Sequence, residues 1–247
     1  MDKTIAVLGG YTYRIPFRWL GYELANSASP VFKNPKDIAL VVFTGGEDVH
    51  PSLYGGADKG ISSTNVGRDA YEKAVFNQCR QYNIKMAGIC RGFQFLNVMA
   101  GGQMYQHLEK HALWGRHPAY FPFSGEILPV SSTHHQLVKL SDGSIPLAWA
   151  LPKRSDIYYG PDALPIEDVD KEIEGALFPN INAMGVQYHP EMMAHSEPGC
   201  KIFLDIVADF LSLPTKELIA KYERRLNHER RIEGAPKIRR VGGKAAR

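Results

Sequence analysis

The sequence predicts an α/β fold in which a doubly wound, mostly parallel sheet carries helices on both faces. Short apolar runs bounded by Gly, Pro or charged residues alternate with longer segments whose apolar residues recur every three or four positions. That alternation is typical of parallel strands connected through helices. The 247 residues are 44% hydrophobic and 22% charged, which is the composition of a globular protein with a sizeable buried core.

The short apolar runs predict the strands. In chain order they lie at residues 4–8, about 29–32, 38–43, 85–89, 126–130, 147–150 and 183–189. The run at 29–32 is the weakest, so the second strand is expected to be reduced. Runs this short, bounded by turn residues, favour strands over helices.

The longer amphipathic segments predict helices at residues 17–26, 69–82, 91–100 and 199–211, with a further one from Pro214 to about residue 231. Beyond it, Gly-Ala-Pro and Gly-Gly-Lys stretches are typical of a frayed end. We therefore expect one domain at 1–214, followed by a basic C-terminal helix and tail at 215–247.

Charge is distributed unevenly. Residues 216–247 hold eleven Lys and Arg against four acidic residues, so they carry +7 and the rest of the chain −4, within a total of +3. A basic tail on a mildly acidic domain indicates a solvated terminus or a docking segment. Nucleic acid is disfavoured as a partner, because the acidic body would oppose wrapping.

The absence of several sequence features predicts the compartment and disfavours some partners. No stretch approaches the ~18 apolar residues that span a bilayer, and no signal-peptide pattern opens the chain, so we predict a cytoplasmic protein without a membrane partner. The three cysteines, Cys79, Cys90 and Cys200, lack paired spacing, which disfavours disulfides and a zinc site.

The strongest chemical signal is Gly88-Ile89-Cys90-Arg91-Gly92, between a predicted strand and a predicted helix. This is the pattern of a nucleophile elbow with sulfur in place of oxygen. The flanking glycines permit a sharp turn, and the helix N-terminus activates a thiol and offers N–H groups to an oxyanion. A buried core cysteine between structural glycines is the alternative from this pentapeptide alone.

The second signal is Gly185-Val186-Gln187-Tyr188-His189-Pro190-Glu191, where a histidine and a carboxylate two residues apart end a predicted strand. Residues i and i+2 of an extended chain face the same side. Glu191 could therefore fix the tautomer of His189, as a base requires. A lone histidine at a strand end would more often be structural.

These motifs, with the upstream Phe-Thr-Gly-Gly-Glu-Asp-Val-His-Pro-Ser-Leu-Tyr-Gly, resemble those of the class I glutamine amidotransferase superfamily. The branch they resemble most is γ-glutamyl-γ-aminobutyrate hydrolase. The resemblance spans roughly residues 38–210 and implies a flavodoxin-like sheet with its site at the C-terminal strand edge. The competing α/β-hydrolase fold is disfavoured, because its acid precedes the histidine by many residues. Residues 11–16 match no motif, which leaves substrate specificity open.

The resemblance also implies roles for particular residues. Cys90 would be the nucleophile, His189 the acid and base, and Glu191 its orienting partner. Backbone N–H groups of Gly45 or Gly46 and of Arg91 would form the oxyanion hole, although the glycines also suit a tight turn. Gln94, His134, His135 and Gln136 would line the γ-glutamyl pocket, although the two adjacent histidines could equally be surface residues.

The predicted function is therefore hydrolysis of the γ-glutamyl amide bond of glutamine or a γ-glutamyl amine through a cysteine thioester. One alternative is a glutaminase subunit that delivers ammonia to a synthetase partner, and a second is an inactive binding protein of the same fold. A homo-oligomer stays open. No cofactor and no metal are implied, because His107, His111 and His117 lack the spacing of metal ligands and are expected at the surface or behind the site.

Overall fold

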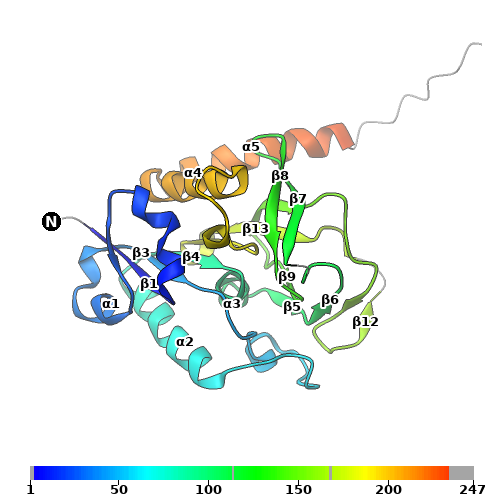
Figure 1. Cartoon of the computed structure of the whole chain (residues 1–247), viewed down its shortest axis with the longest axis horizontal. Coiled ribbons are helices and arrows are strands. Elements are labelled where there is room, and N and C mark those ends of the chain that lie inside the picture. Colours follow the sequence, from blue (N-terminus) through cyan, green and yellow to red (C-terminus); the bar gives the residue numbers. More distant parts are fainter. Residues whose placement is uncertain (1–2, 113, 167–168, 234–247) are drawn as a thin grey trace, which may run out of the picture.

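A computed structural model describes residues 3–112, 114–166 and 169–233, and within them a nine-stranded sheet runs through the molecule (Figure 1). Its strands are β1 (Thr4–Leu8), β2 (Glu23–Ala25), β3 (Ile38–Phe43), β4 (Lys85–Ile89), β7 (Gly115–Phe121), β8 (Glu126–Ser132), β10 (Ile145–Ala150), β13 (Ile173–Phe178) and β14 (Ala183–Val186). Their order is β2-β1-β3-β4-β14-β13-β10-β7-β8. Neighbours from β2 to β14 are parallel, and those from β14 to β8 are antiparallel.

Helices cover both sides of this sheet. They are α1 (Ser29–Lys33), α2 (Val66–Gln81), α3 (Arg91–Met99), α4 (Pro198–Ser212) and α5 (Thr215–Glu233). In Figure 1, α4 and α5 lie along one side of the strands, and α1 and α2 lie along the other. The predicted α/β class is therefore confirmed.

Several short elements complete the fold. Strands β5 (Gln103–Tyr105) and β9 (Leu137–Lys139) pair with each other, and β6 (His107–Leu108), β11 (Tyr158–Tyr159) and β12 (Pro165–Ile166) form a small sheet. Short 3-10 helices are η1 (Tyr11–Arg14), η2 (Pro16–Trp19), η3 (Pro35–Asp37), η4 (Pro51–Tyr54), η5 (Pro179–Ile181) and η6 (Pro190–Met192). Elements this short have too few residues to show a periodic pattern.

Most predicted elements agree with the structure, but two predictions were wrong. Residues 17–26 do not form a helix, because Gly21 takes a left-handed φ of +74° between η2 and β2. Residues 29–32 belong to helix α1 and not to a strand. Pro30 lies in its first turn, where the fixed proline φ suits a helix start.

The predicted strand at 183–189 ends early, at Val186. Two strands of the antiparallel half, β7 and β13, were not predicted. Polar residues interrupt both: β7 reads Gly-Arg-His-Pro-Ala-Tyr-Phe and β13 reads Ile-Glu-Gly-Ala-Leu-Phe. His117 in β7 and Glu174 in β13 are nevertheless both buried.

Helix α5 joins the main core by one face. Leu218, Tyr222 and Leu226 recur every four residues and are buried in the same apolar cluster as the sheet. The Tyr222 ring lies 4.8 Å from that of Phe123, and its hydroxyl donates to Asp209 Oδ2 at 2.9 Å. The frayed end expected after residue 231 lies almost wholly outside the described residues. Within those residues, no helix has the length and apolarity to cross a membrane.

Candidate active site

Cys90 lies at the sharp turn between strand β4 and helix α3. Its backbone takes φ +52° and ψ −109°, a conformation that is strained for a residue with a Cβ. A Cβ on Gly88 would lie 2.5 Å from the amide nitrogen of Phe93, and one on Gly92 would lie 2.1 Å from the carbonyl oxygen of Phe43. Both positions therefore require glycine, and the turn presents the Cys90 thiol at the C-terminal edge of the sheet.

His189 follows β14, the parallel neighbour of β4, and its ring faces the thiol. Its Nδ1 lies 2.5 Å from Oε1 of Glu191, which η6 holds two residues further on. The backbone N–H of His189 donates to Ser131 Oγ at 2.7 Å. The contact of the ring with Glu191 and that of the backbone with Ser131 therefore fix the position of the imidazole.

The electrostatics of this pair favour the charged imidazole. Burial lowers the pKa of His189, but hydrogen bonds with Cys90 and Glu191 outweigh it and raise that pKa to about 10. An imidazolium next to a cysteine is the arrangement that supports a thiolate nucleophile.

The loop Thr44-Gly45-Gly46 runs beside Cys90 and is clamped by Arg68 of α2. The Arg68 guanidinium donates to the carbonyl oxygens of Thr44 and Gly45, each at 2.9 Å. A Cβ on Gly46, whose φ is +139°, would lie 2.0 Å from Arg68 Nη1. The clamp holds the two carbonyl groups toward α2 and so fixes the orientation of the loop's peptide units.

An ion-pair network, exposed at Glu47 and half-buried at Arg68 but otherwise buried, supports that clamp. Arg68 also pairs with Glu47 and Glu72, at 2.8 and 2.9 Å. The Arg91 side chain is buried and pairs with both Asp69 and Glu72. Its guanidinium is thus occupied by ion pairs with side chains of α2. The group of Arg91 that is suited to stabilise an oxyanion is therefore its backbone N–H at the start of α3.

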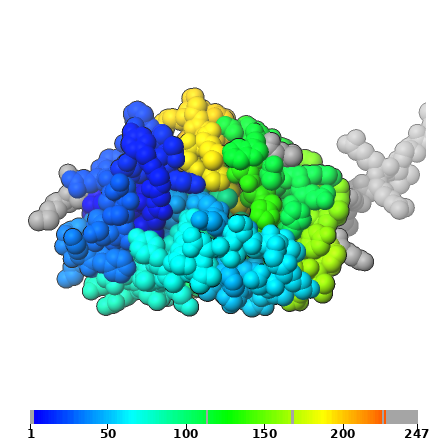
Figure 2. All heavy atoms as spheres, turned by 60° about the horizontal axis from the view of Figure 1, so that its bottom comes forward, coloured from blue at the N-terminus to red at the C-terminus, as the bar shows by residue number. Residues whose placement is uncertain are grey.

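A pocket of about 180 Å³ opens beside Cys90. It is lined by Gly46, Glu47, Asp48, Ser63, Cys90, Arg91, Gln94, Thr133, His134, His135 and Gln136. The structure therefore brings the residues expected to bind substrate to the same cavity as the thiol. Figure 2 looks onto the face where the blue N-terminal residues, the yellow segment near residue 190 and the green segment near residue 130 come together.

The polar side chains of the pocket have different partners. His135 Nε2 lies 3.2 Å from Asp48 Oδ2, and Gln94 donates to Gln187 Oε1 at 3.3 Å. His134 and Gln136 are bonded instead to groups that do not line the pocket. Gln136 donates to Ser62 Oγ at 2.8 Å, and the nitrogens of His134 face a buried histidine and glutamate cluster.

His111 and His117 belong to that cluster and are fully buried, so of the two expected positions, at the surface or behind the site, they take the second. His107 is half-buried beside His135, and their Nδ1 atoms are 3.5 Å apart. His117 lies on β7, a strand that was not predicted, and this strand turns its side chain inward.

Two residues beside Cys90 were not predicted. The hydroxyl of Tyr13 would lie 2.6 Å from a Cβ on Gly45, and its ring centroid is 6.2 Å from that of His189. Burial and the nearby Glu191 and Cys90 raise the pKa of Tyr13, so its hydroxyl stays protonated. Gln187 Nε2 lies 3.6 Å from Cys90 Sγ. The two-residue spacing between Gln187 and His189 could have indicated that they share a face, whereas no local signal marks Tyr13.

Comparisons with known proteins agree with this fold and motif set. The sequence profile of the family Peptidase C26 matches residues 33–157. Protein NtpR of Enterococcus hirae is 33% identical over 178 residues, which cover 63% of this chain and 67% of that protein. YvdE of Lactococcus lactis, named a glutamine amidotransferase-like protein, is 30% identical over 191 residues, 68% of this chain and 72% of that protein.

A solved glutamine amidotransferase from Thermotoga maritima has the same fold, with a TM-score of 0.53 and 16% identity, over 92% of each chain. Together with the profile match over half of the sequence, these similarities show that the chain belongs to the Peptidase C26 family of class I glutamine amidotransferase-like proteins.

Proposed function

We propose that this protein is a γ-glutamyl hydrolase that cleaves the side-chain amide of glutamine or of a γ-glutamyl amine. The observation that carries the proposal is the convergence of Cys90, His189 and Glu191 at a small polar pocket. A pocket of about 180 Å³ suits a ligand of amino-acid size better than a polymer segment.

In the proposed reaction, Cys90 Sγ attacks the γ-carbonyl carbon and forms a tetrahedral intermediate. Its oxyanion would receive hydrogen bonds from backbone N–H groups of the Gly45-Gly46 loop and of Arg91. The C–N bond then breaks as His189 gives its proton to the departing nitrogen, leaving a γ-glutamyl thioester. His189 next takes a proton from water, whose oxygen attacks the thioester and releases glutamate and the thiol.

The test is an assay of the purified chain alone. We expect release of glutamate from glutamine or from at least one γ-glutamyl amine, such as γ-glutamyl-γ-aminobutyrate, together with the amine in equal amount. A γ-glutamyl adduct on Cys90, detected by mass spectrometry after acid quenching, would identify the thioester. Failure of a folded preparation to release glutamate from any of these compounds would overturn the proposal of a self-sufficient hydrolase.

A further inference from the structure

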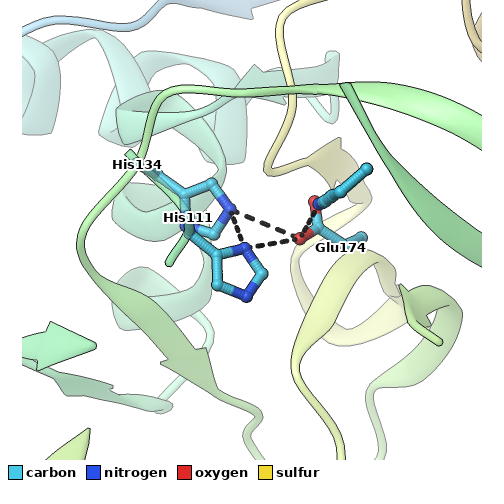
Figure 3. Close-up of side chains that lie close together, drawn as sticks. His111, His134 and Glu174 are labelled. Atoms are coloured by element: carbon cyan, nitrogen blue, oxygen red, sulfur yellow. Dashed lines mark hydrogen bonds and ion pairs between the residues drawn. The ribbon is translucent and has the colours of Figure 1, made fainter. Parts of the chain in front are cut away.

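Behind the pocket wall, four buried side chains from separate segments point their polar atoms at one another. His111 comes from the loop before β7, His117 from β7, His134 from the segment after β8, and Glu174 from β13. One ligand-type atom from each residue lies within 4.8 Å of all the others. Figure 3 shows His111, His134 and Glu174 converging on one point.

Four of the six distances between these atoms are close to those of a tetrahedral metal centre. Atoms bound about 2.0–2.1 Å from a tetrahedral zinc ion lie about 3.3–3.4 Å from one another. Glu174 Oε1 lies 3.5 Å from His111 Nδ1, 3.0 Å from His117 Nε2 and 3.3 Å from His134 Nε2. His111 Nδ1 and His134 Nε2 are 3.1 Å apart.

Outer partners determine where two of these rings carry their protons. His134 Nδ1 lies 2.9 Å from the carbonyl oxygen of Gln136, which can only accept, so the proton is on Nδ1. His111 Nε2 lies 3.1 Å from Glu172 Oε2. Glu172 Oε2 also accepts from the backbone N–H of Arg154 at 2.8 Å, and its Oε1 accepts from that of Ser155 at 2.7 Å, so this carboxylate acts as an acceptor.

In these tautomers His111 Nδ1 and His134 Nε2 carry lone pairs in place of protons. The two lone pairs face each other, and both face the carboxylate of Glu174. Electron pairs at such separations repel unless a cation lies between them. His117 Nδ1 and Glu174 Oε2 have no hydrogen-bond partner among the described residues.

We propose that His111, His117, His134 and Glu174 bind a divalent transition metal ion, with zinc as the best fit. Three imidazoles and one carboxylate in tetrahedral spacing suit Zn²⁺, whereas Mg²⁺ and Ca²⁺ require more oxygen ligands. Glu172 and the Gln136 carbonyl supply the outer hydrogen bonds that ligating histidines usually make. Four protein ligands leave no open position, so the ion has a structural role.

The site would stabilise one wall of the substrate pocket. His134 is a ligand and also lines the pocket, between Thr133 and His135. A metal ion at this point connects that wall to β7 and β13, so the position of His135 depends on it. The inference rests on the cluster alone, and its test requires no substrate.

The experiment measures metal binding by the full chain without a histidine tag. Protein dialysed against a chelator is mixed with Zn²⁺, passed through a desalting column and analysed by elemental mass spectrometry. We expect about one zinc per chain for the wild type and below about 0.1 for His117→Gln. Glu172→Gln, which keeps the ligands but alters the partner of His111, should weaken zinc affinity about 10- to 100-fold in a competition titration.

His195→Gln is the matched control, because His195 is exposed and lies on the segment after η6, apart from the cluster. It should keep one zinc per chain. Since His117→Gln could fail to fold, the wild type is also titrated with Co²⁺, whose visible spectrum distinguishes tetrahedral from octahedral coordination. A wild-type chain that retains no zinc and gives no tetrahedral cobalt spectrum would overturn the proposal, as would equal zinc content in wild type and folded His117→Gln.

Discussion

The Cys90 thiol is the residue on which the proposed chemistry depends. Cys90→Ala should abolish γ-glutamyl hydrolysis while the protein stays folded, because none of the other residues described as lining the pocket is a cysteine. Turnover is measured by glutamate release and folding by circular dichroism. Cys79→Ala and Cys200→Ala are the controls, since both thiols are buried in helices α2 and α4. They should keep activity within a few-fold of the wild type, and retained turnover in Cys90→Ala would contradict the assignment.

Substitutions of His189 and of Glu191 should lower kcat to different extents. His189→Ala removes the group that exchanges the proton, so we expect kcat to fall at least ~10³-fold. Glu191→Gln keeps an acceptor oxygen near Nδ1 and should cost less, about 10- to 100-fold. Steady-state kinetics on the same substrate compares them. Equal losses would instead give Glu191 a direct part in the reaction.

The Asp48–His135 pair predicts a pH dependence at the pocket. The hydrogen bond to Asp48 raises the pKa of His135 above its usual value. The contact therefore stabilises the fold fully below the unfolded pKa of about 6.5 and loses its effect as pH rises through the folded pKa. We expect the melting-temperature advantage of the wild type over Asp48→Asn to be larger at about pH 5.5 than at about pH 8.5.

An NMR titration of the His135 ring measures the same contact directly. Its pKa should fall in Asp48→Asn and stay unchanged in Asp142→Asn, whose carboxylate is exposed and outside this pocket. An identical His135 titration in the wild type and in Asp48→Asn would show that the pair has no energetic consequence.

The residues at the elbow were predictable because their signals are local. Gly88 and Gly92 flank Cys90 within five positions, and Glu191 follows His189 by two. The buried cluster of His111, His117, His134 and Glu174 has no such signal, because its members come from segments up to 63 positions apart. Tyr13 was missed for a similar reason, since only the contact between η1 and η6 brings it to His189.

At the scale of elements, helix α2 positions the loop beside Cys90 through a single side chain. Arg68→Lys keeps the positive charge, but one ammonium group cannot bond to two carbonyl oxygens and two carboxylates in the same planar arrangement. We expect kcat to fall about 10- to 100-fold with little change in KM, because the loop's peptide units would lose their orientation. Steady-state kinetics measures both constants.

Arg80→Lys is the matched control, since Arg80 lies exposed in the last turn of the same helix. Its kinetic constants should equal those of the wild type. Wild-type kcat in Arg68→Lys would show that the loop holds its position without the clamp.

The two elements that were predicted wrongly have different physical causes. The pattern at 17–26 has the apolar spacing of a helix, but Gly21 with its left-handed φ ends any regular helix there. Pro30 was placed in a strand, although a proline near a helix start is equally compatible with local sequence.

Parallel strands β1, β3 and β4 were predicted within a residue because both of their faces are buried, which gives continuous apolar runs.

At the scale of the whole molecule, the antiparallel strands β13, β10, β7 and β8 extend the parallel sheet, and the segment after β8 provides the far wall of the pocket. The thiol comes from the parallel half, while His134 and His135 follow β8 of the antiparallel half. The pocket therefore lies between the two halves of one sheet. The resemblance to a known family predicted His134, His135 and Gln136 at this wall, whereas the apolar pattern alone did not predict the strands β7 and β13 behind it.

Helix α5 packs against the main core, and two truncations distinguish its contribution to stability from that of the basic tail. A chain ending at residue 214 loses the buried Leu218, Tyr222 and Leu226. At roughly 1.5–3 kcal/mol for each buried side chain, the loss is comparable to the 5–15 kcal/mol that typically stabilises a domain. A chain ending at residue 231 keeps all three and should match the full chain in unfolding free energy and in activity. Urea titrations followed by circular dichroism compare the three proteins. An unchanged midpoint for the chain ending at residue 214 would make 1–214 a self-standing domain, and a lower midpoint for the chain ending at 231 would assign the tail a structural role.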